Sequence, residues 1–323
     1  MRPRLAVRWL GVPRRNDLLL QALDRFYAVE ETADAEVAFC GEGVPASAAS
    51  PDAVTFFVPT ELWWPPLAQY DYSFGFLHLQ APRYRRLPNY ALEHAAAALI
   101  KPPDFAEQVL DERREFCSFV VSNGNPRRTF QRIYFFQALH AQRRVSSGGR
   151  MFNNCGPLPP DFNALDDFIR RHRMHIAIEN KAWRGYCTEK IASAMAAGAI
   201  PLYWGDPSVE QDFNPASFVH LRHFPDLLAA RDHVLRLADD RDAQARLLRE
   251  PWFHGNRPNA AYDLDTLAEF LRHSISRGRQ SKRRLFPVTW AHKNWEKLSG
   301  RVANLHYRLR APALPLLPVP AAR

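Results

Sequence analysis

The sequence predicts an α/β protein made of two Rossmann-like domains followed by a basic C-terminal tail. Strand-like apolar runs alternate with helix-like runs from Arg4 to Ile100, and the alternation starts again near Phe116. Between the two series, Lys101-Pro102-Pro103 breaks the helical pattern, because proline fixes φ and lacks an N–H. We therefore expect domains at residues 1–112 and 113–270, with the tail at 271–323.

The first half has the pattern of a βαβ unit. Arg4–Leu10 alternates as a strand does, Asp17–Tyr27 has Leu and Phe at helical spacing, and Glu36–Cys40 is again apolar. Val54–Val58 predicts a further buried strand. An Ala-rich helix is expected from Asn89 to about Ile100.

The second half repeats the alternation. Each strand pattern is followed by a helix pattern, so the crossovers should be right-handed and the strands parallel. The expected elements are a strand at Phe116–Val121, a helix at Thr129–Gln142, a strand at Met174–Ile178, a helix at Thr188–Ala197 ended by Gly198, and a strand at Ala199–Trp204.

The composition is that of a globular protein. The chain has 323 residues, of which 46% are hydrophobic, enough for two buried cores. No run approaches the roughly 18 apolar residues of a membrane-spanning helix, and we expect a cytoplasmic location. The four cysteines form no CxxC pair, which favours buried thiols over a disulfide framework or a zinc site.

The positive charge is concentrated at the C-terminal end. From Phe270 onward there are twelve Lys and Arg residues and one acid, Glu296, so the body of the chain is nearly neutral despite the net charge of +9. This distribution argues against a nucleic-acid groove in the body. Apolar residues at spacings of 3 and 4 predict an amphipathic helix in the tail: Trp295, Leu298, Val302, Leu305 and Leu309.

Two interpretations of this tail helix stay open. Its basic face could lie on an anionic membrane surface, which would make the protein peripheral on the inner face of the membrane. Alternatively, its apolar face packs back on the body.

One segment has the pattern of an anion site. Ile178-Glu179-Asn180 leaves the carboxyl end of a predicted parallel strand, where open α/β sheets bind ligands, and Thr188-Glu189-Lys190 opens the next helix. A lysine in the first helical turn opposes the macrodipole by roughly 0.3–1 kcal/mol. A bound diphosphate would explain it, because backbone N–H groups and the ammonium would hold the phosphates together. The alternative is a solvated surface lysine.

The same region carries a long series of motifs. Residues 178–224 read Glu-Asn, Tyr-x-Thr-Glu-Lys, Ala-Gly-Ala-Ile-Pro, Gly-Asp-Pro and Phe-Asn-Pro-Ala-Ser-Phe-Val-His. This order resembles the bacterial α1,3-fucosyltransferase family, inverting enzymes that use GDP-fucose. The similarity extends back to Phe116–Asn123 and more weakly to Asp71-Tyr72, and it leaves the tail out.

The resemblance implies a fold and a division of labour. The fold is GT-B, two Rossmann-like domains facing a cleft, with the acceptor bound by the first domain and GDP-fucose by the second. The donor-binding residues that it implies are Arg132, Asn180, Tyr186, Glu189 and Lys190. Lys190 and Arg132 would neutralise the diphosphate leaving group, Tyr186 would bind a phosphate, and Asn180 and Glu189 would bind the nucleoside and sugar.

The family also uses a glutamate of the N-terminal domain as general base. Its place falls on Glu61, although Thr60-Glu61-Leu62 departs from the family's Gly-Glu-Asn, and Glu42 is the rival. Trp63 and Trp64 beside Glu61 either stack on acceptor sugars or only pin the loop.

Protein-bound metal is not expected. The chain has no DxD-type pair in a loop, Asp166-Asp167 is expected at the acidic start of a helix, and the twelve histidines show no ligand spacing with carboxylates or cysteines. Lys190 and Arg132 would supply the charge that a metal supplies elsewhere. We therefore predict no cofactor, no requirement for a divalent metal, and GDP-fucose as a substrate.

The predicted reaction is a single in-line displacement that moves L-fucose from GDP-β-L-fucose to a hydroxyl of a glycan acceptor. The family suggests O3 of N-acetylglucosamine in a lactosamine unit of a bacterial surface glycan such as lipopolysaccharide or a glycoprotein. Two alternatives remain: a related glycosyltransferase with another donor or acceptor, and, less favoured, a nucleic-acid-binding protein that acts through the basic tail.

Overall fold

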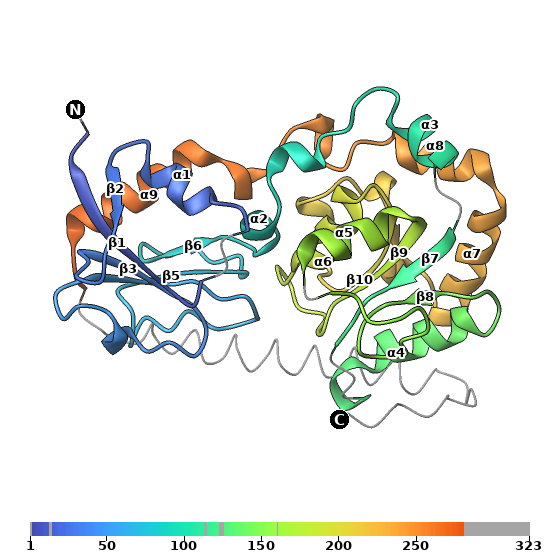
Figure 1. The fold of residues 1–323 in the computed structure, drawn as a ribbon, viewed down its shortest axis with the longest axis horizontal. Helices are drawn as coiled ribbons and strands as arrows, with labels where there is room; N and C mark the ends of the chain where they lie inside the picture. Colours follow the sequence, from blue (N-terminus) through green and yellow to red (C-terminus); the bar gives the residue numbers. More distant parts are fainter. Residues whose placement is uncertain (1, 13–14, 113–114, 123–125, 160, 281–323) are drawn as a thin grey trace. The chain divides into compact units, whose positions relative to one another are not determined.

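The computed structural model describes residues 2–12, 15–112, 115–122, 126–159 and 161–280. They form two α/β units, each with a parallel sheet (Figure 1). Within the described ranges, the first unit comprises 2–97, 185–189 and 258–280, and the second comprises 98–184 and 190–257. The amphipathic helix predicted in the tail lies outside these ranges. Among the helices that are described, none is long and apolar enough to cross a membrane.

The sheet of the first unit has six parallel strands in the order β2-β1-β3-β4-β5-β6. Its strands are β1 (Arg4–Leu10), β2 (Ala28–Glu31), β3 (Val37–Cys40), β4 (Val54–Phe57), β5 (Tyr72–Gly75) and β6 (Tyr84–Arg86). The predicted bounds of β1 are confirmed residue for residue. The mostly exposed edge strand β2 was not predicted, because only four residues separate it from the end of α1 and it lacks an apolar run.

A row of stacked aromatic rings runs from strand to strand across this sheet. Trp9 stacks on Phe39 with ring centroids 4.4 Å apart, and Phe39 stacks on Phe56 at 5.1 Å. Phe74 continues the row and meets Phe270 edge to face at 5.6 Å. Phe270 belongs to α9 (Leu264–Arg277), which also packs on α1 (Leu18–Leu23). Late residues therefore complete the core of the first unit.

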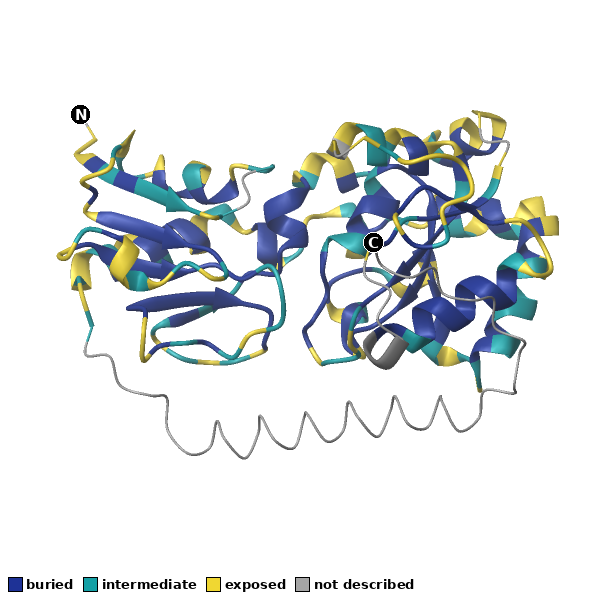
Figure 2. Ribbon diagram, turned by 60° about the horizontal axis from the view of Figure 1, so that its bottom comes forward, coloured by how far each residue is buried: buried dark blue, intermediate teal, exposed yellow. Residues whose placement is uncertain are grey.

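The second unit has five parallel strands in the order β11-β10-β9-β7-β8. They are β7 (Glu115–Phe119), β8 (Ser146–Ser147), β9 (His172–Ile178), β10 (Ile200–Trp204) and β11 (Val219–His220). Its helices are α3 (Phe105–Glu112), α4 (Pro126–His140), α5 (Phe162–Arg170), α6 (Glu189–Ala196), α7 (Leu227–Asp239) and α8 (Arg241–Arg249). The central strands of both sheets are buried, as expected where parallel strands have both faces covered (Figure 2).

The chain divides between the units differently from the expected boundaries at 112 and 270. Residues 98–112, expected in the first domain, belong to the second unit, where α3 packs on α8. Lys101 fixes this connection, since its Nζ donates to the carbonyls of Leu248 at 2.8 Å and Glu250 at 2.5 Å and lies 3.2 Å from the centre of the Trp252 ring. Residues 258–280 return to the first unit through α9.

Two predicted helices need correction. The single Ala-rich helix at Asn89–Ile100 is wrong, because α2 (Tyr90–Glu93) ends at the extended residue His94 and a one-turn helix, Ala96–Leu99, follows. The pair Asp166-Asp167 lies inside α5 and not at its start; the N-cap is Asp161, whose carboxylate accepts from the N–H of Asn163. By contrast, Gly198 follows the end of α6 with φ of +70°, as predicted.

Candidate functional site

Arg132 and Asn180 meet at the carboxyl end of β9 in the second unit. The guanidinium of Arg132, carried by α4, donates through Nε and NH2 to the carbonyl of Ile178 at 3.1 and 2.7 Å. Its NH2 also donates to Oδ1 of Asn180 at 2.8 Å. Arg132 is only 2% exposed, so it is not a solvent-facing helical arginine. It places a fixed positive charge where the chain leaves the sheet.

Lys190 lies beside a buried carboxylate that the sequence analysis did not assign. Its Nζ is 3.3 Å from Oε2 of Glu179, a side chain with no exposure. Glu179 has room because residue 205 is glycine: a Cβ there would lie 2.4 Å from Cγ of Glu179. Arg132 contacts Ile178 and Asn180, and Lys190 contacts Glu179, which lies between them in the chain, so both cations meet the end of β9 and are called the Arg132 cluster below. Such a cluster suits a phosphate ligand.

A cavity of about 520 Å³ opens at the same edge of this sheet. Val120 and Ser122 follow β7 and line it, as do Gly148 and Gly149 after β8. A Cβ on Gly149 would lie 2.3 Å from the carbonyl oxygen of Val121, so only glycine allows this close approach. Because β7 pairs with β9, the cavity and the Arg132 cluster lie at the carboxyl ends of neighbouring strands.

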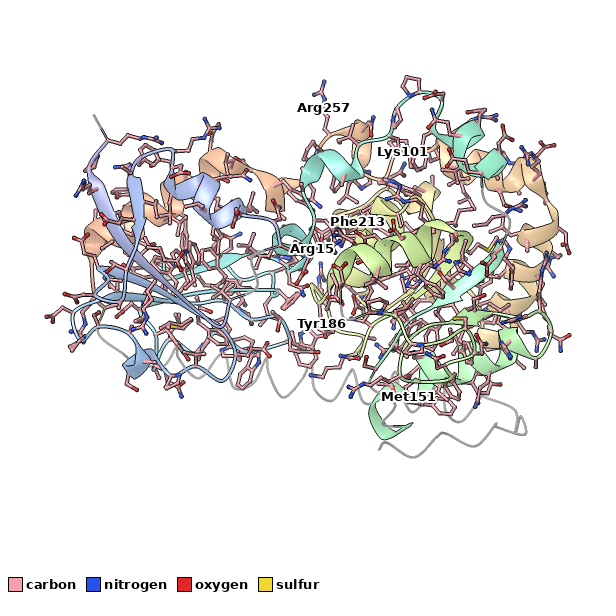
Figure 3. The ribbon with its side chains drawn as sticks, in the orientation of Figure 1. Arg15, Lys101, Met151, Tyr186, Phe213 and Arg257 are labelled. Atoms are coloured by element: carbon pink, nitrogen blue, oxygen red, sulfur yellow. The ribbon has the colours of Figure 1, made fainter. Side chains whose placement is uncertain are left out.

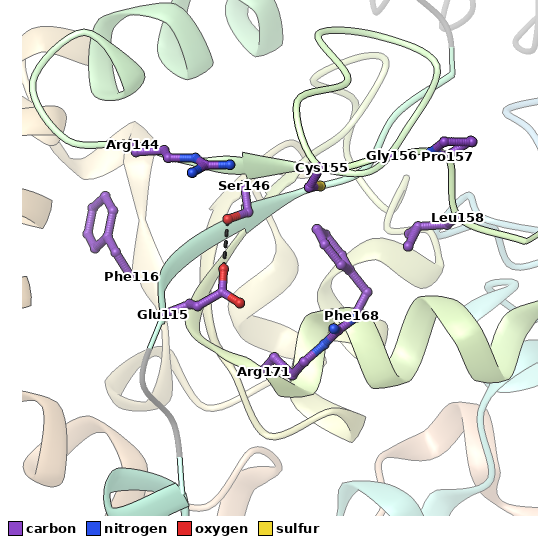
Figure 4. Close-up of a pocket in the computed structure, with 10 residues that line it drawn as sticks. All are labelled: Glu115, Phe116, Arg144, Ser146, Cys155, Gly156, Pro157, Leu158, Phe168 and Arg171. Atoms are coloured by element: carbon purple, nitrogen blue, oxygen red, sulfur yellow. Dashed lines mark hydrogen bonds between the residues drawn. The ribbon is translucent and has the colours of Figure 1, made fainter.

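A larger cavity, about 580 Å³, lies at the other end of β7 (Figure 4). Glu115, the first residue of β7, lines it and accepts a hydrogen bond of 2.8 Å from Oγ of Ser146. Arg144 and Arg171 also contribute to its wall. Ligands of open parallel sheets bind at the carboxyl ends, so we do not assign the donor to this cavity.

In the first unit, Glu42 and Glu61 lie in the loops that follow β3 and β4. Glu42 follows β3, and its Oε1 accepts from the backbone N–H groups of Thr60 at 3.0 Å and Glu61 at 2.5 Å. Because β3 and β4 pair in parallel, these loops leave the sheet side by side. Glu42, the rival candidate for the base, therefore holds the loop that carries Glu61.

The segment Gly185–Glu189 belongs to the first unit and brings Tyr186 to Glu61. The Tyr186 hydroxyl donates to Oε2 of Glu61 at 2.5 Å, and its buried ring, labelled in Figure 3, meets Phe76 edge to face at 5.1 Å. Gly185 has φ of +89°, and a Cβ there would lie 2.4 Å from the Phe76 carbonyl oxygen. Arg86 also donates to the carbonyl of Gly185 at 3.3 Å. Glycine is thus required for this approach.

Glu189 lies among polar side chains that the sequence analysis did not single out. Asn89 donates through Nδ2 to Oε2 of Glu189 at 3.0 Å. Burial and the nearby Glu189 carboxylate raise the pKa of Glu93 to about 7. Burial and the charge of Arg15 lower the pKa of His94 to about 4, against an opposing effect of Glu189. Near neutral pH, Glu93 is therefore partly protonated and His94 neutral.

The two tryptophans beside Glu61 differ in exposure. Trp63 is 49% exposed and touches Phe57 edge to face at 6.1 Å, whereas Trp64 is half-buried. Trp63 therefore offers an indole face to a ligand.

The predicted residues thus form two groups, one in each unit. Arg132, Asn180 and Lys190 lie in the second unit, and Glu61, Tyr186 and Glu189 lie in the first. The unit boundary passes between the sequence neighbours Glu189 and Lys190. The missed residues are Glu179, Asn89 and Glu93; only Glu179, which adjoins Asn180, carried a signal in the sequence.

Comparison with known proteins matches most of the second unit to a family model. Residues 110–253 match the model of the C-terminal region of glycosyltransferase family 10 (fucosyltransferase). The α-(1,3)-fucosyltransferase FucT of Helicobacter pylori is 33% identical over 213 residues, 56% of this chain and 43% of that protein. The putative fucosyltransferase R654 of Acanthamoeba polyphaga mimivirus is 24% identical over 174 residues, 51% and 28% of the two chains. The chain thus spans less than half the length of these curated relatives.

Solved structures extend the match to both units. The crystal structure of an α1,3-fucosyltransferase superposes with a TM-score of 0.70 at 23% identity and covers 88% of this chain and 94% of that one. A crystal structure of an α1,3-fucosyltransferase with GDP-fucose gives 0.66 at 25% identity, with the same coverage. The predicted resemblance and the GT-B fold class are both confirmed.

Proposed function

We propose that the protein transfers L-fucose from GDP-β-L-fucose to a hydroxyl of a glycan, since residues 110–253 match the model of the C-terminal region of glycosyltransferase family 10 (fucosyltransferase). The observation that carries the proposal is the Arg132, Asn180 and Lys190 cluster at the carboxyl end of β9, inside the matched residues. The α1,3-fucosyltransferase solved with GDP-fucose supports the choice of donor.

The second unit would bind the diphosphate of GDP-fucose. Departure of GDP adds negative charge to the β-phosphate as the bond to the anomeric carbon breaks. Cations already fixed near that phosphate stabilise the transition state without reorganisation. Arg132 is held by the Ile178 carbonyl and Lys190 by Glu179, so both charges are in place beforehand. With two fixed cations, the transfer step should need no metal ion.

Glu61 would act as the general base. Its carboxylate takes the proton of the acceptor hydroxyl while that oxygen attacks the anomeric carbon and GDP leaves with the bonding electrons. A single displacement of this kind inverts the anomeric configuration and gives an α-fucoside. Tyr186 fixes the carboxylate and Glu42 fixes its backbone, so the base is oriented before the acceptor binds.

For the acceptor we propose N-acetylglucosamine in a lactosamine-type glycan, with transfer to O3. This choice rests on the names of the relatives, several of which are α-(1,3)-fucosyltransferases or 4-galactosyl-N-acetylglucosaminide 3-α-L-fucosyltransferases. The exposed indole of Trp63 supports it, because aromatic faces pack on the apolar faces of sugar rings. A cytoplasmic location and attachment to the membrane through the tail stay predictions.

The experiment that tests the function combines donor binding with transfer. Titration calorimetry compares GDP-fucose, GDP-mannose and UDP-galactose on the wild type, on Lys190→Ala and on Lys181→Ala, which removes an exposed lysine nearby. We expect GDP-fucose to bind best and Lys190→Ala alone to weaken it, by about 10- to 100-fold for the loss of a charged hydrogen-bond donor. A folded wild type that binds no GDP-sugar would overturn the proposal.

A further inference from the structure

A cluster of two imidazoles and one carboxylate lies at the edge strand of the second unit, among residues that the proposed transfer does not use. Glu210 belongs to the one-turn helix Val209–Gln211, His220 ends β11, and His223 ends the one-turn helix Leu221–His223. His220 Nδ1 is 3.0 Å and His223 Nε2 is 2.8 Å from the same carboxylate oxygen, Oε1 of Glu210. One ligand atom from each residue lies within 4.8 Å of the other two.

These separations are close to those of a metal site. Zinc binds imidazole nitrogen and carboxylate oxygen at about 2.0–2.2 Å, so two ligand atoms in a tetrahedral site lie about 3.3–3.5 Å apart. The contacts of 2.8 and 3.0 Å in the structure are a few tenths of an ångström shorter. A small side-chain rotation would therefore let one ion replace both imidazole–carboxylate contacts.

The surroundings hold these groups in place. The buried ring of His220 lies 5.9 Å from the ring centroids of both Tyr203 and Phe218, and 4.4 Å from that of His223. The backbone carbonyl of Glu210 is fixed by Nε2 of His254 at 2.8 Å. Ligands that are ordered in advance lose little entropy when an ion binds.

Solvent reaches the cluster from one side. The side chain of His223 is 59% exposed and that of Glu210 37%, whereas that of His220 is 4% exposed. An ion could therefore enter from solvent and keep a water molecule as a fourth ligand. Sites with three protein ligands and one open position are common for zinc.

We propose that Glu210, His220 and His223 bind one divalent transition-metal ion, with zinc as the favoured ion. Two imidazoles and a carboxylate are donors that zinc accepts, whereas Mg²⁺ and Ca²⁺ prefer ligand sets made of oxygen alone. The bound ion links Glu210, which precedes β11, and His223, which follows it, to His220 at the end of this strand. The expectation of no ligand spacing between histidines and carboxylates missed this group, because Glu210 lies ten residues before His220.

The test uses the full chain, stripped with EDTA and free of any affinity tag, with Zn²⁺ alone as the probe. All proteins carry Cys155→Ser, because Cys155 is exposed while the other three cysteines are buried. Three variants are compared with this background: His223→Ala, Glu210→Gln and the control His273→Ala, which removes an exposed histidine of α9. Bound zinc is measured by elemental analysis after gel filtration and by titration against a chelating dye.

We expect one zinc per chain in the background protein and in His273→Ala. We expect at least a tenfold weaker affinity in both His223→Ala and Glu210→Gln, and a zinc-dependent rise in Tm that these two variants lose. Co²⁺ provides a second readout, since tetrahedral binding would give visible d–d absorption. A cluster that merely shares hydrogen bonds would leave zinc content equal in all variants, and that result, or no stoichiometric zinc in the folded background protein, would overturn the proposal. None of these measurements, of zinc content, zinc affinity, Tm or Co²⁺ absorption, depends on fucosyl transfer.

Discussion

The hydroxyl of Tyr186 donates a hydrogen bond of 2.5 Å to Oε2 of Glu61, a residue 125 positions earlier in the chain. The two side chains come from different loops, and each loop is held separately: that of Glu61 by Glu42, and that of Tyr186 by Gly185 and Phe76. Such double anchoring leaves the carboxylate few orientations. Tyr186 therefore has two candidate roles. The contact with Glu61 indicates that it positions the base, whereas the family resemblance implies that it binds a donor phosphate.

We expect Tyr186→Phe to lower kcat by about 10- to 100-fold, because a hydrogen bond to a charged group contributes about 1.5–3 kcal/mol. The ring and its contact with Phe76 are kept, so the fold should be unaffected. Transfer kinetics and GDP titration decide between the roles: a fall in kcat at unchanged GDP affinity indicates positioning of Glu61, and weaker GDP binding indicates a phosphate contact. Tyr27→Phe, at a half-buried tyrosine of the same unit, is the control.

Glu61→Gln and Glu42→Gln should differ strongly. Loss of a general base lowers kcat by about 10²- to 10⁴-fold, so Glu61→Gln should abolish most transfer while GDP-fucose still binds. Glutamine at residue 42 keeps a carbonyl oxygen for the N–H groups of Thr60 and Glu61, so Glu42→Gln should retain most activity. The two variants are compared by their transfer rates at saturating donor. A larger loss in Glu42→Gln than in Glu61→Gln would indicate that Glu42 is the base.

Arg132→Lys should weaken donor binding and destabilise the second unit. One ammonium cannot match the planar fork that serves both the Ile178 carbonyl and Asn180. We expect a loss of about 1–3 kcal/mol in the free energy of unfolding, since buried polar groups lose partners. Urea denaturation and GDP titration measure the two effects. The control is Arg143→Lys, in an exposed ion pair with Asp239, which should change neither stability nor GDP affinity. If both variants changed these quantities equally, the special role of Arg132 would be contradicted.

Gly185→Ala and Gly156→Ala form a matched pair, since both glycines have φ of +89°. Alanine in this region of φ costs about 1–2 kcal/mol at either position. Only at residue 185 would the new Cβ also meet a backbone atom, the Phe76 carbonyl oxygen, whereas nothing lies within 4 Å at residue 156. We expect Gly185→Ala alone to displace Tyr186 and lower kcat. Thermal unfolding and transfer assays test this, and equal kinetics would show that the close approach does not matter.

Glu93→Gln should change how stability depends on pH. The folded-state pKa of about 7 exceeds the ordinary 4.5, so folded Glu93 binds more protons than unfolded Glu93, and its contribution to stability falls as pH rises from about 4.5 through 7. His94, with its pKa lowered to about 4, acts in the opposite direction between about 4 and 6.5. After discounting for partial solvent screening, we expect Glu93→Gln to be more stable than wild type at pH 8 by about 1–2 kcal/mol.

Chemical denaturation of both proteins at pH 5 and pH 8 measures this difference. The His94 contribution is common to both and cancels in the comparison. If the difference in unfolding free energy between Glu93→Gln and wild type were the same at pH 5 and pH 8, Glu93 would have an ordinary pKa.

Local patterns in the sequence were sufficient to locate several strands. A buried parallel strand needs a continuous apolar run, so β1, β4, β9 and β10 could be located to within a residue or two. The long, contiguous order of motifs around Asn180 and Lys190 carried the family resemblance, and the match of residues 110–253 to the family model agrees with it. The family resemblance placed the general base on Glu61, directly after β4, and that role stays a prediction.

The pairings between distant residues were decided by the tertiary structure alone. Nothing local in Glu42 indicates that it binds the backbone of Glu61, and nothing in Tyr186 indicates that it reaches Glu61. The return of α9 to the first unit depends on Phe270 meeting the aromatic row. Sequence patterns report which face of an element is buried, whereas the partner on that face is set by packing between elements. That is why the strands were predictable and the contact of Tyr186 with Glu61 was not.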